Sequence, residues 1–262
     1  MTDDLLFEID NKIATITLNR PEARNAFSDG MLEAWAKALR ECQRDPNVNV
    51  VVLTGRGKAF CGGGDISEMG WKTDNPANEV KTYLKTRVYP VAEAVQALEK
   101  PLIVAVNGAA TGAGMDMCLL GDIRFAAESA RFAETYVKVG LVPGDGGGFL
   151  LPRVVGLSKA LELLWTGDFI DAPEALRLGI VSNVFPDAKL MEETYAFAER
   201  LARGPTLAIS LIKRTIYQSL STDFTGALEL VSSHMGLLAG TRDHAEAVSA
   251  FMEKRDPVFE GR

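Results

Sequence analysis

The chain has few of the residues from which many enzyme sites are built. Its 262 residues include only two histidines, His234 and His244, and three cysteines, Cys42, Cys61 and Cys118. No G-x-S-x-G, H-E-x-x-H or C-x-x-C motif occurs, which excludes a serine-hydrolase elbow and the common zinc sites. The odd number of cysteines favours reduced thiols with structural roles. We therefore expect no metal site and no catalysis by histidine.

The charge pattern gives no sign of nucleic-acid or membrane binding. The net charge is −7, the pI is about 5.1, and Lys and Arg form no run, whereas nucleic-acid binders usually carry a basic face. The acidic N-terminus, MTDDLLFEID, does not resemble a signal peptide. The most apolar segment, residues 101–120, is interrupted by glycines and Asp116 and is a poor membrane span. A cytoplasmic protein is expected.

Nucleotide-binding motifs are missing as well. Gly57-Lys58 is followed by Ala59 and lacks the upstream glycine of a P-loop. No G-x-G-x-x-G follows a predicted strand, so the dinucleotide fingerprint is absent. These absences disfavour the hypothesis that the protein is a nucleotide-dependent oxidoreductase.

The hydrophobic pattern indicates the α/β class. It predicts a β-hairpin over residues 5–18, strands at 48–53, 102–106 and 123–127, and helices after Ser28, over 79–99 and over 115–120. This alternation suggests right-handed βαβ crossovers. From about residue 158 the chain reads as mainly helical, with an apolar run at 180–185 and a last helix capped by Thr241. We expect a core over residues 1–200 and a helical C-terminal region over 201–262.

Three glycine-rich stretches follow or lie near predicted strands. They are KAFCGGGD (58–65), NGAATGAGMD (107–116) and VGLVPGDGGG (139–148). Glycine permits positive φ and close approach of a ligand to the backbone, and N–H groups at a helix start attract anions. Two such N–H groups that converge would form an oxyanion hole.

Several segments, in their order and spacing, resemble the enoyl-CoA hydratase/isomerase (crotonase) superfamily. They are LNRPEARNAFSDGML, AFCGGGDISEM, AVNGAATGAGMDM, GDIRFA, VGLVPGDGGG and AFMEKRDPVFEGR, which together span nearly the whole chain. The resemblance implies a spiral of repeated ββα units, a helical C-terminal trimerisation region, and trimers that often pair into hexamers. It also implies an acyl-CoA substrate, an enolate intermediate, and no cofactor beyond the coenzyme A that the substrate carries.

The resemblance assigns roles to particular residues. The backbone N–H groups of Gly64 and Ala113 are the implied oxyanion donors. The implied coenzyme contacts are Arg24, Lys58, Asp65 and Ile66, with Phe251 and Lys254 reaching the ligand of a neighbouring subunit.

The acid/base positions depart from the family pattern. Hydratases of the family use two glutamates, and this chain has Asp116 at the first position and Tyr136 at the second. Asp145, in the PGDGGG loop, is a further candidate carboxylate. Our hypothesis is that Asp116 is the general acid or base, that its pKa is raised by burial, and that Tyr136 and Asp145 orient substrate, water or proton.

The sequence leaves other acid/base residues and other reactions open. Glu134 and Glu68 are weaker acid/base candidates, and Glu134 could instead face solvent or pair with Arg131. The resemblance leads us to expect hydration or double-bond isomerisation of an unsaturated acyl-CoA. The same resemblance allows thioester hydrolysis, decarboxylation, dehalogenation, or a non-catalytic acyl-CoA binding protein.

Overall fold

The fold is built around two β-sheets. The computed structural model describes residues 3–65 and 76–261, and Ile66 and Glu68 lie outside them. The larger sheet has the order β1 (Leu5–Asp10), β2 (Ile13–Leu18), β3 (Val50–Gly55), β5 (Leu102–Val106), β7 (Ile123–Ala127) and β10 (Asn183–Phe185). The smaller sheet has the order β4 (Ala59–Cys61), β6 (Ala109–Thr111), β8 (Arg131–Ala133) and β9 (Ile170–Asp171).

Consecutive strands are divided between the two sheets. The chain passes from β3 to β4, from β5 to β6 and from β7 to β8, each time leaving the larger sheet for the smaller one. Strands β3, β5 and β7 run parallel, and so do β4, β6 and β8. Helices follow each strand pair, which confirms the predicted α/β spiral of ββα units.

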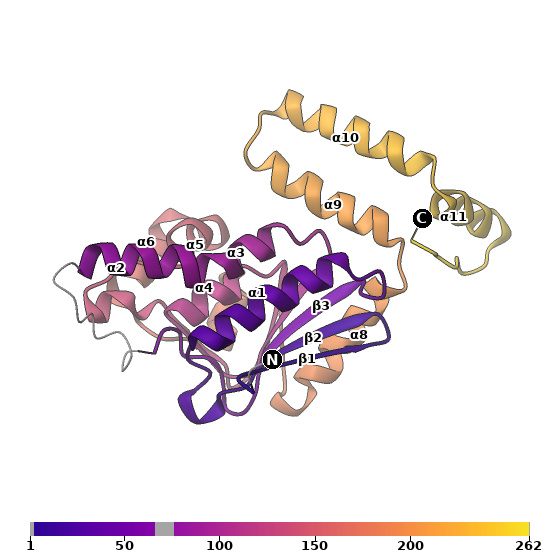
Figure 1. The fold of residues 1–262 in the computed structure, drawn as a ribbon. Coiled ribbons are helices and arrows are strands. Elements are labelled where there is room, and N and C mark those ends of the chain that lie inside the picture. Colours follow the sequence, from indigo (N-terminus) through magenta and orange to yellow (C-terminus); the bar gives the residue numbers. More distant parts are fainter. Residues whose placement is uncertain (1–2, 66–75, 262) are drawn as a thin grey trace.

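Helices cover both faces of the larger sheet and continue beyond it (Figure 1). They are α1 (Asp29–Arg44), α2 (Pro76–Tyr83), α3 (Tyr89–Gln96), α4 (Ala113–Leu119), α5 (Gly147–Val155), α6 (Leu157–Thr166), α7 (Ala172–Arg177), α8 (Leu190–Ala202), α9 (Thr206–Ser219), α10 (Phe224–Ala239) and α11 (Arg242–Glu253). A π-helical turn, η2 (Leu84–Val88), and a 3₁₀ turn, η3 (Thr135–Val139), matter for the site below.

The central strands are buried on both faces, as their continuous apolar runs predict. In β3, Val51 and Leu53 pack into the same core as Trp35 of α1, whereas Val50 and Val52 pack with α8 on the opposite face. Side chains alternate between the two faces of a strand, so one short run of valines supports two helical layers.

Local signals in the sequence set several boundaries. The Ser28 hydroxyl accepts the N–H of Met31 and begins α1, and Thr241 caps α11 in the same way through His244. The hairpin predicted at 5–18 is confirmed as β1 and β2. Its turn lies at Asn11–Lys12, both with positive φ.

The helix predicted over 79–99 is interrupted. Helices α2 and α3 are separated by the π-helical turn η2. Pro90 stands at the start of α3, where a residue without an N–H cannot donate to the preceding turn. Leu84, the first residue of the π-helical turn, lies near Gly144, where an added Cβ would stand 3.7 Å from Leu84 Cδ2.

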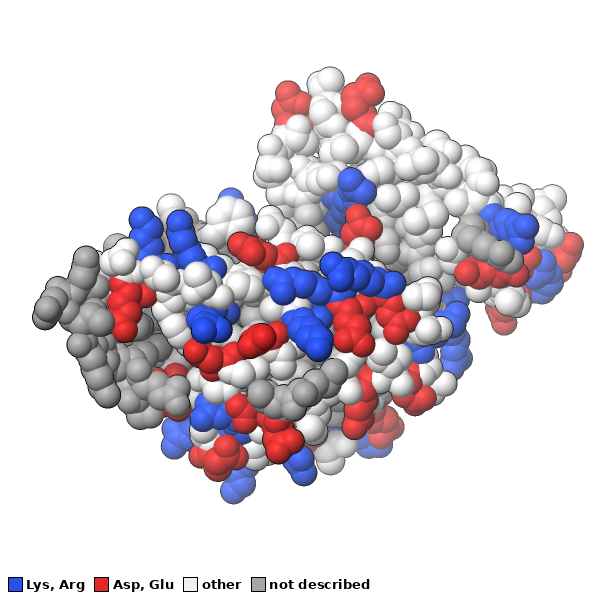
Figure 2. All heavy atoms as spheres, viewed as in Figure 1, with Lys and Arg blue, Asp and Glu red and all other residues white. Residues whose placement is uncertain are grey.

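Helices α9 to α11 extend away from the sheets (Figure 1). Asp122, in the loop before β7, anchors α9 by accepting hydrogen bonds from Lys213 at 2.7 Å and Tyr217 at 2.8 Å. On the face shown in Figure 2, basic and acidic side chains are interspersed over the core, while the α9–α10 pair is mainly uncharged. Its exposed apolar side chains include Ile212, Ile216, Leu220, Phe224, Leu228, Val231, Met235 and Leu237. The division of the chain after residue 200 stays a prediction.

The three cysteines are free and buried, as expected of structural thiols. Burial raises the pKa of each thiol to about 12, so none is a ready nucleophile. In the part of the chain that the structure describes, every helix is too short or too polar to span a bilayer.

Candidate active site

The carboxyl ends of β4, β6 and β8 bring the candidate residues together. These strands lie side by side and parallel. Gly62–Gly64 follow β4, Gly112 and Ala113 follow β6, and Glu134 follows β8. Because parallel strands end at the same edge of their sheet, three segments far apart in the sequence meet there, which is where ligands bind in many α/β proteins.

Glycine allows the first two segments to touch. At Gly63, with φ of +87°, a Cβ would stand 2.8 Å from the Thr111 carbonyl oxygen and 3.0 Å from the Ala113 nitrogen. At Gly114, a Cβ would stand 2.2 Å from the Cys61 carbonyl oxygen. Side chains at these positions would force the loops apart, so the glycines are required by packing.

The N–H groups of Gly64 and Ala113 have no acceptor among the described residues. Phe27 pairs with Gly64 in a parallel bridge in which the Phe27 N–H donates to the Gly63 carbonyl. In that pattern the N–H of Gly64 points away from Phe27. Ala113 is the first residue of α4 and has no intrahelical acceptor. Within residues 3–65 and 76–261, neither N–H donates to a protein acceptor.

Asp116, Tyr136 and Asp145 form one hydrogen-bonded cluster. The Tyr136 hydroxyl lies 2.8 Å from Asp116 Oδ2 and 3.2 Å from Asp145 Oδ2. The backbone N–H of Asp145 donates to Asp116 Oδ2 at 2.9 Å. Asp116 comes from α4, Tyr136 from η3 and Asp145 from the loop before α5. The structure therefore gathers all three residues that were proposed for acid/base chemistry.

Burial dominates the protonation of this cluster. It raises the pKa of Asp145 to about 7, with the charge of Asp116 as the second cause. Burial also raises the pKa of Asp116, against the hydrogen bonds from Tyr136 and from the Asp145 backbone, which lower it. The pKa of the Tyr136 phenol is raised by burial and by the two carboxylates. A carboxyl group with a pKa near neutrality can both accept and donate a proton under working conditions.

Glu134, one of the weaker acid/base candidates, belongs to the same cluster. Its side chain is only 2% exposed, which rules out the alternative that it faces solvent. Arg131 pairs with Asp171 instead. Glu134 is the residue that follows β8, and Phe132 and Ala133 before it are buried as well.

The residues implied for coenzyme binding lie at both ends of β4. The Arg24 carbonyl accepts the N–H of Gly62, and the Arg24 side chain is exposed. Lys58 is exposed in the turn between β3 and β4, where its carbonyl lies against Gly108. Asp65 forms an ion pair with Arg20 at 3.8 Å. Ile66 lies outside the described residues.

Phe251 and Lys254 lie elsewhere. Both are exposed at the end of α11, in the extended C-terminal region that leads away from the core (Figure 1). The structure of one chain therefore does not bring them to the strand ends. Contact with the ligand of a neighbouring subunit, as the resemblance implies, stays a prediction.

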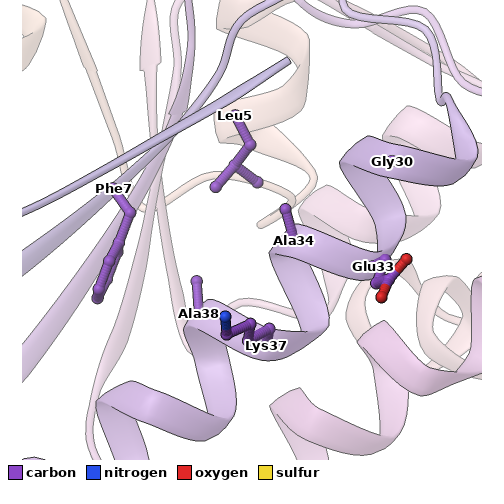
Figure 3. A pocket seen from close by; sticks show the side chains of 7 residues that line it. All are labelled: Leu5, Phe7, Gly30, Glu33, Ala34, Lys37 and Ala38. Atoms are coloured by element: carbon purple, nitrogen blue, oxygen red, sulfur yellow. The ribbon is translucent and has the colours of Figure 1, made fainter. Parts of the chain in front are cut away.

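A surface pocket is separate from this cluster. It lies between β1 and α1, has a volume of about 390 Å³, and is shown in Figure 3. Its lining residues are Leu5, Phe7, Gly30, Glu33, Ala34, Lys37 and Ala38. It contains none of the candidate acid/base residues. In the described residues, no group of three or more His, Cys, Asp or Glu side chains could hold a metal ion.

Comparison with known proteins agrees with the geometry. The family model described as Enoyl-CoA hydratase/isomerase matches residues 8–262. The chain is 36% identical, over the full length of both proteins, to the 1,2-epoxyphenylacetyl-CoA isomerase of Escherichia coli. It is 37% identical to the 2,3-dehydroadipyl-CoA hydratase of the same organism, over 99% of both chains.

Solved structures give the same result. The crystal structure of enoyl-CoA hydratase from Bacillus anthracis superposes with a TM-score of 0.94 at 33% identity, covering 99% of this chain and 100% of that one. The match extends through the C-terminal helices as well as the two sheets. The chain belongs to the enoyl-CoA hydratase/isomerase family.

Proposed function

We propose that the protein is an acyl-CoA enzyme that moves a proton along an unsaturated acyl chain and so shifts its double bond. The thioester oxygen would accept hydrogen bonds from the N–H groups of Gly64 and Ala113. Removal of a proton from a carbon conjugated with the thioester places negative charge on that oxygen, and two fixed dipoles stabilise it. Coenzyme A enters as part of the substrate, and the proposal needs no further cofactor.

Asp145 is the proposed proton carrier. Its pKa of about 7 lets its carboxylate take a proton from one carbon and return it to another. Asp116, the residue first expected to do this, is fully buried, and its Oδ2 already accepts two hydrogen bonds. We assign Asp116 to holding Tyr136 and the Asp145 loop in place.

The Tyr136–carboxylate contacts favour isomerisation over hydration. Hydratases of the family place two carboxylates around a water, and the second of these positions is a phenol here. Its raised pKa keeps Tyr136 protonated, so it donates hydrogen bonds and cannot act as a base toward water. One carboxyl that takes and returns a proton completes a double-bond shift without any water.

The test is product analysis with matched 2-enoyl-CoA and 3-enoyl-CoA substrates in D₂O. We expect the two isomers to interconvert with deuterium incorporated at the carbon that receives the proton, and little 3-hydroxyacyl-CoA. Asp145→Asn should lower kcat by about 100-fold or more, while Asp168→Asn, at an exposed position, should not. Full turnover by Asp145→Asn would refute the assignment, and 3-hydroxyacyl-CoA as the main product would favour hydration.

The same proposal includes a homotrimer or homohexamer in the cytoplasm. The exposed apolar side chains of α9 and α10 support self-association, because monomeric proteins seldom leave contiguous apolar surface of this kind in water. Light scattering after size-exclusion chromatography should give a mass of three or six chains. A mass of one chain would contradict this part of the proposal.

A further inference from the structure

Glu134 is a buried carboxyl group that the proposed proton transfer does not use. It follows β8 directly and its side chain is 2% exposed. Burying a carboxylate away from water is costly unless the charge is paired or hydrogen-bonded. A residue that bears this cost inside the proposed active site calls for a physical explanation.

Both carboxyl oxygens of Glu134 lack a hydrogen-bond donor in the part of the chain that the structure describes. Neither Oε1 nor Oε2 of Glu134 meets an N–H or O–H donor of good geometry in the described residues, and the same is true of Asp116 Oδ1. The backbone N–H of Gly147 lies close enough to Asp116 to lower its pKa. Asp116 Oδ1 and Glu134 Oε1 both lie beside Gly147. A Cβ on Gly147 would stand 1.9 Å from Asp116 Oδ1 and 2.9 Å from Glu134 Oε1. Two carboxyl groups so placed can form a hydrogen bond with each other when one of them is protonated.

The surroundings decide which group keeps that proton. Asp116 Oδ2 accepts from the Tyr136 hydroxyl and from the Asp145 N–H, and both bonds favour the charged form of Asp116. Glu134 receives no such bond. Burial first, then the charge of Asp116 and, more weakly, that of Asp145, raise the pKa of Glu134 to about 10. Glu134 in its charged form also raises the pKa of the nearby Cys118 thiol.

We propose that Glu134 is a positioning residue that stays neutral and donates a hydrogen bond from its carboxyl O–H to Asp116 Oδ1. This hydrogen bond keeps Asp116 ionised and correctly oriented beside Tyr136 and Asp145. This inference rests on the role proposed above for Asp145. Glu134 does not contact the reacting carbons. It acts through Asp116, whose negative charge in turn favours the protonated form of Asp145.

Removing the Glu134 donor should therefore change the pKa of Asp145. In Glu134→Leu, Asp116 loses a hydrogen bond and binds its own proton more readily. The charge that raises the pKa of Asp145 is then partly lost, and the pKa of Asp145 falls. Glu134→Gln keeps an N–H donor of similar size and should preserve the effect.

The kinetic test is the pH dependence of kcat/KM for the wild type and these two variants. The part of the profile that reports the titration of Asp145 is the part that disappears in Asp145→Asn. In Glu134→Leu this part should move to lower pH by about one unit or more. In Glu134→Gln it should stay at the wild-type position. Wild-type profiles in both variants would overturn the proposal.

A second measurement needs neither turnover nor the leucine variant. At about pH 9, Asp145 is ionised while Glu134 still holds its proton, given their pKa values of about 7 and about 10. The infrared spectrum of the protein without ligand should then show a carboxylic acid C=O band that Glu134→Gln removes and Asp145→Asn retains. No difference between wild type and Glu134→Gln would refute the neutral state of Glu134, whatever reaction the enzyme performs.

Discussion

Replacing Glu134 by glutamine should stabilise the folded protein at neutral and alkaline pH. The pKa of Glu134 is raised from an ordinary value of 4.5 to about 10. Between these two values the folded state retains a proton that the unfolded state has released. The contribution of Glu134 to stability is thus fully present below about pH 4.5 and is lost progressively as the pH rises toward about 10. Glutamine carries no titrating proton, so the variant does not lose stability in this way as the pH rises.

The size of the effect follows from the same two pKa values. One pKa unit corresponds to about 1.4 kcal/mol, and neutral pH lies about 2.5 units above the ordinary pKa of glutamate. Glu134→Gln should therefore gain roughly 3 kcal/mol relative to wild type near pH 7 and almost nothing near pH 4.5. The amide can still donate to Asp116 Oδ1, so no buried acceptor loses its partner.

Urea unfolding at a fixed protein concentration, repeated across this pH range, measures the difference. Glu128→Gln is the matched control, because it makes the same chemical change at an exposed side chain and should follow the wild-type curve. Parallel pH profiles for wild type and Glu134→Gln would refute the reasoning, since they would mean that Glu134 is as easily ionised in the folded protein as in water.

Two other substitutions test the geometry of the cluster. Gly147→Ala should destabilise the fold by about 1–3 kcal/mol in urea unfolding and lower turnover, because its Cβ would overlap Asp116 Oδ1. Gly148→Ala, one position later with open space around its Cβ, should do neither, and equal effects of the two changes would contradict this. Tyr136→Phe removes a hydrogen bond that lowers the pKa of Asp145. The part of the pH–rate profile that reports Asp145 should therefore move to higher pH. An unchanged profile would contradict the hydrogen bond between Tyr136 and Asp145.

The larger sheet could be predicted from the sequence because its strands carry strong local signals. The run at Val50–Val52 and the run at Leu102–Val106 are apolar and buried on both faces, and β7 begins and ends where the pattern IRFAA predicted. The smaller sheet had no comparable signal. Strands β4 and β6 have three residues each and lie within glycine-rich stretches, where composition alone indicates loops.

The site could be predicted only in part. The resemblance singled out Asp116, Tyr136 and Asp145, and the structure brings them into hydrogen-bonding contact. It gave no reason to expect buried Glu134, because burial depends on the register of β8 and on the packing of Gly147 against it. Such tertiary contacts are made by segments distant in the sequence and leave no local pattern.

The position of a bound thioester tests the account most directly. A crystal structure of the protein with an acyl-CoA that turns over slowly would locate the carbonyl oxygen relative to the N–H groups of Gly64 and Ala113. We predict that both nitrogens lie about 2.7–3.1 Å from that oxygen, with Asp145 facing the carbons that exchange the proton. A thioester oxygen bound away from either nitrogen would contradict the account.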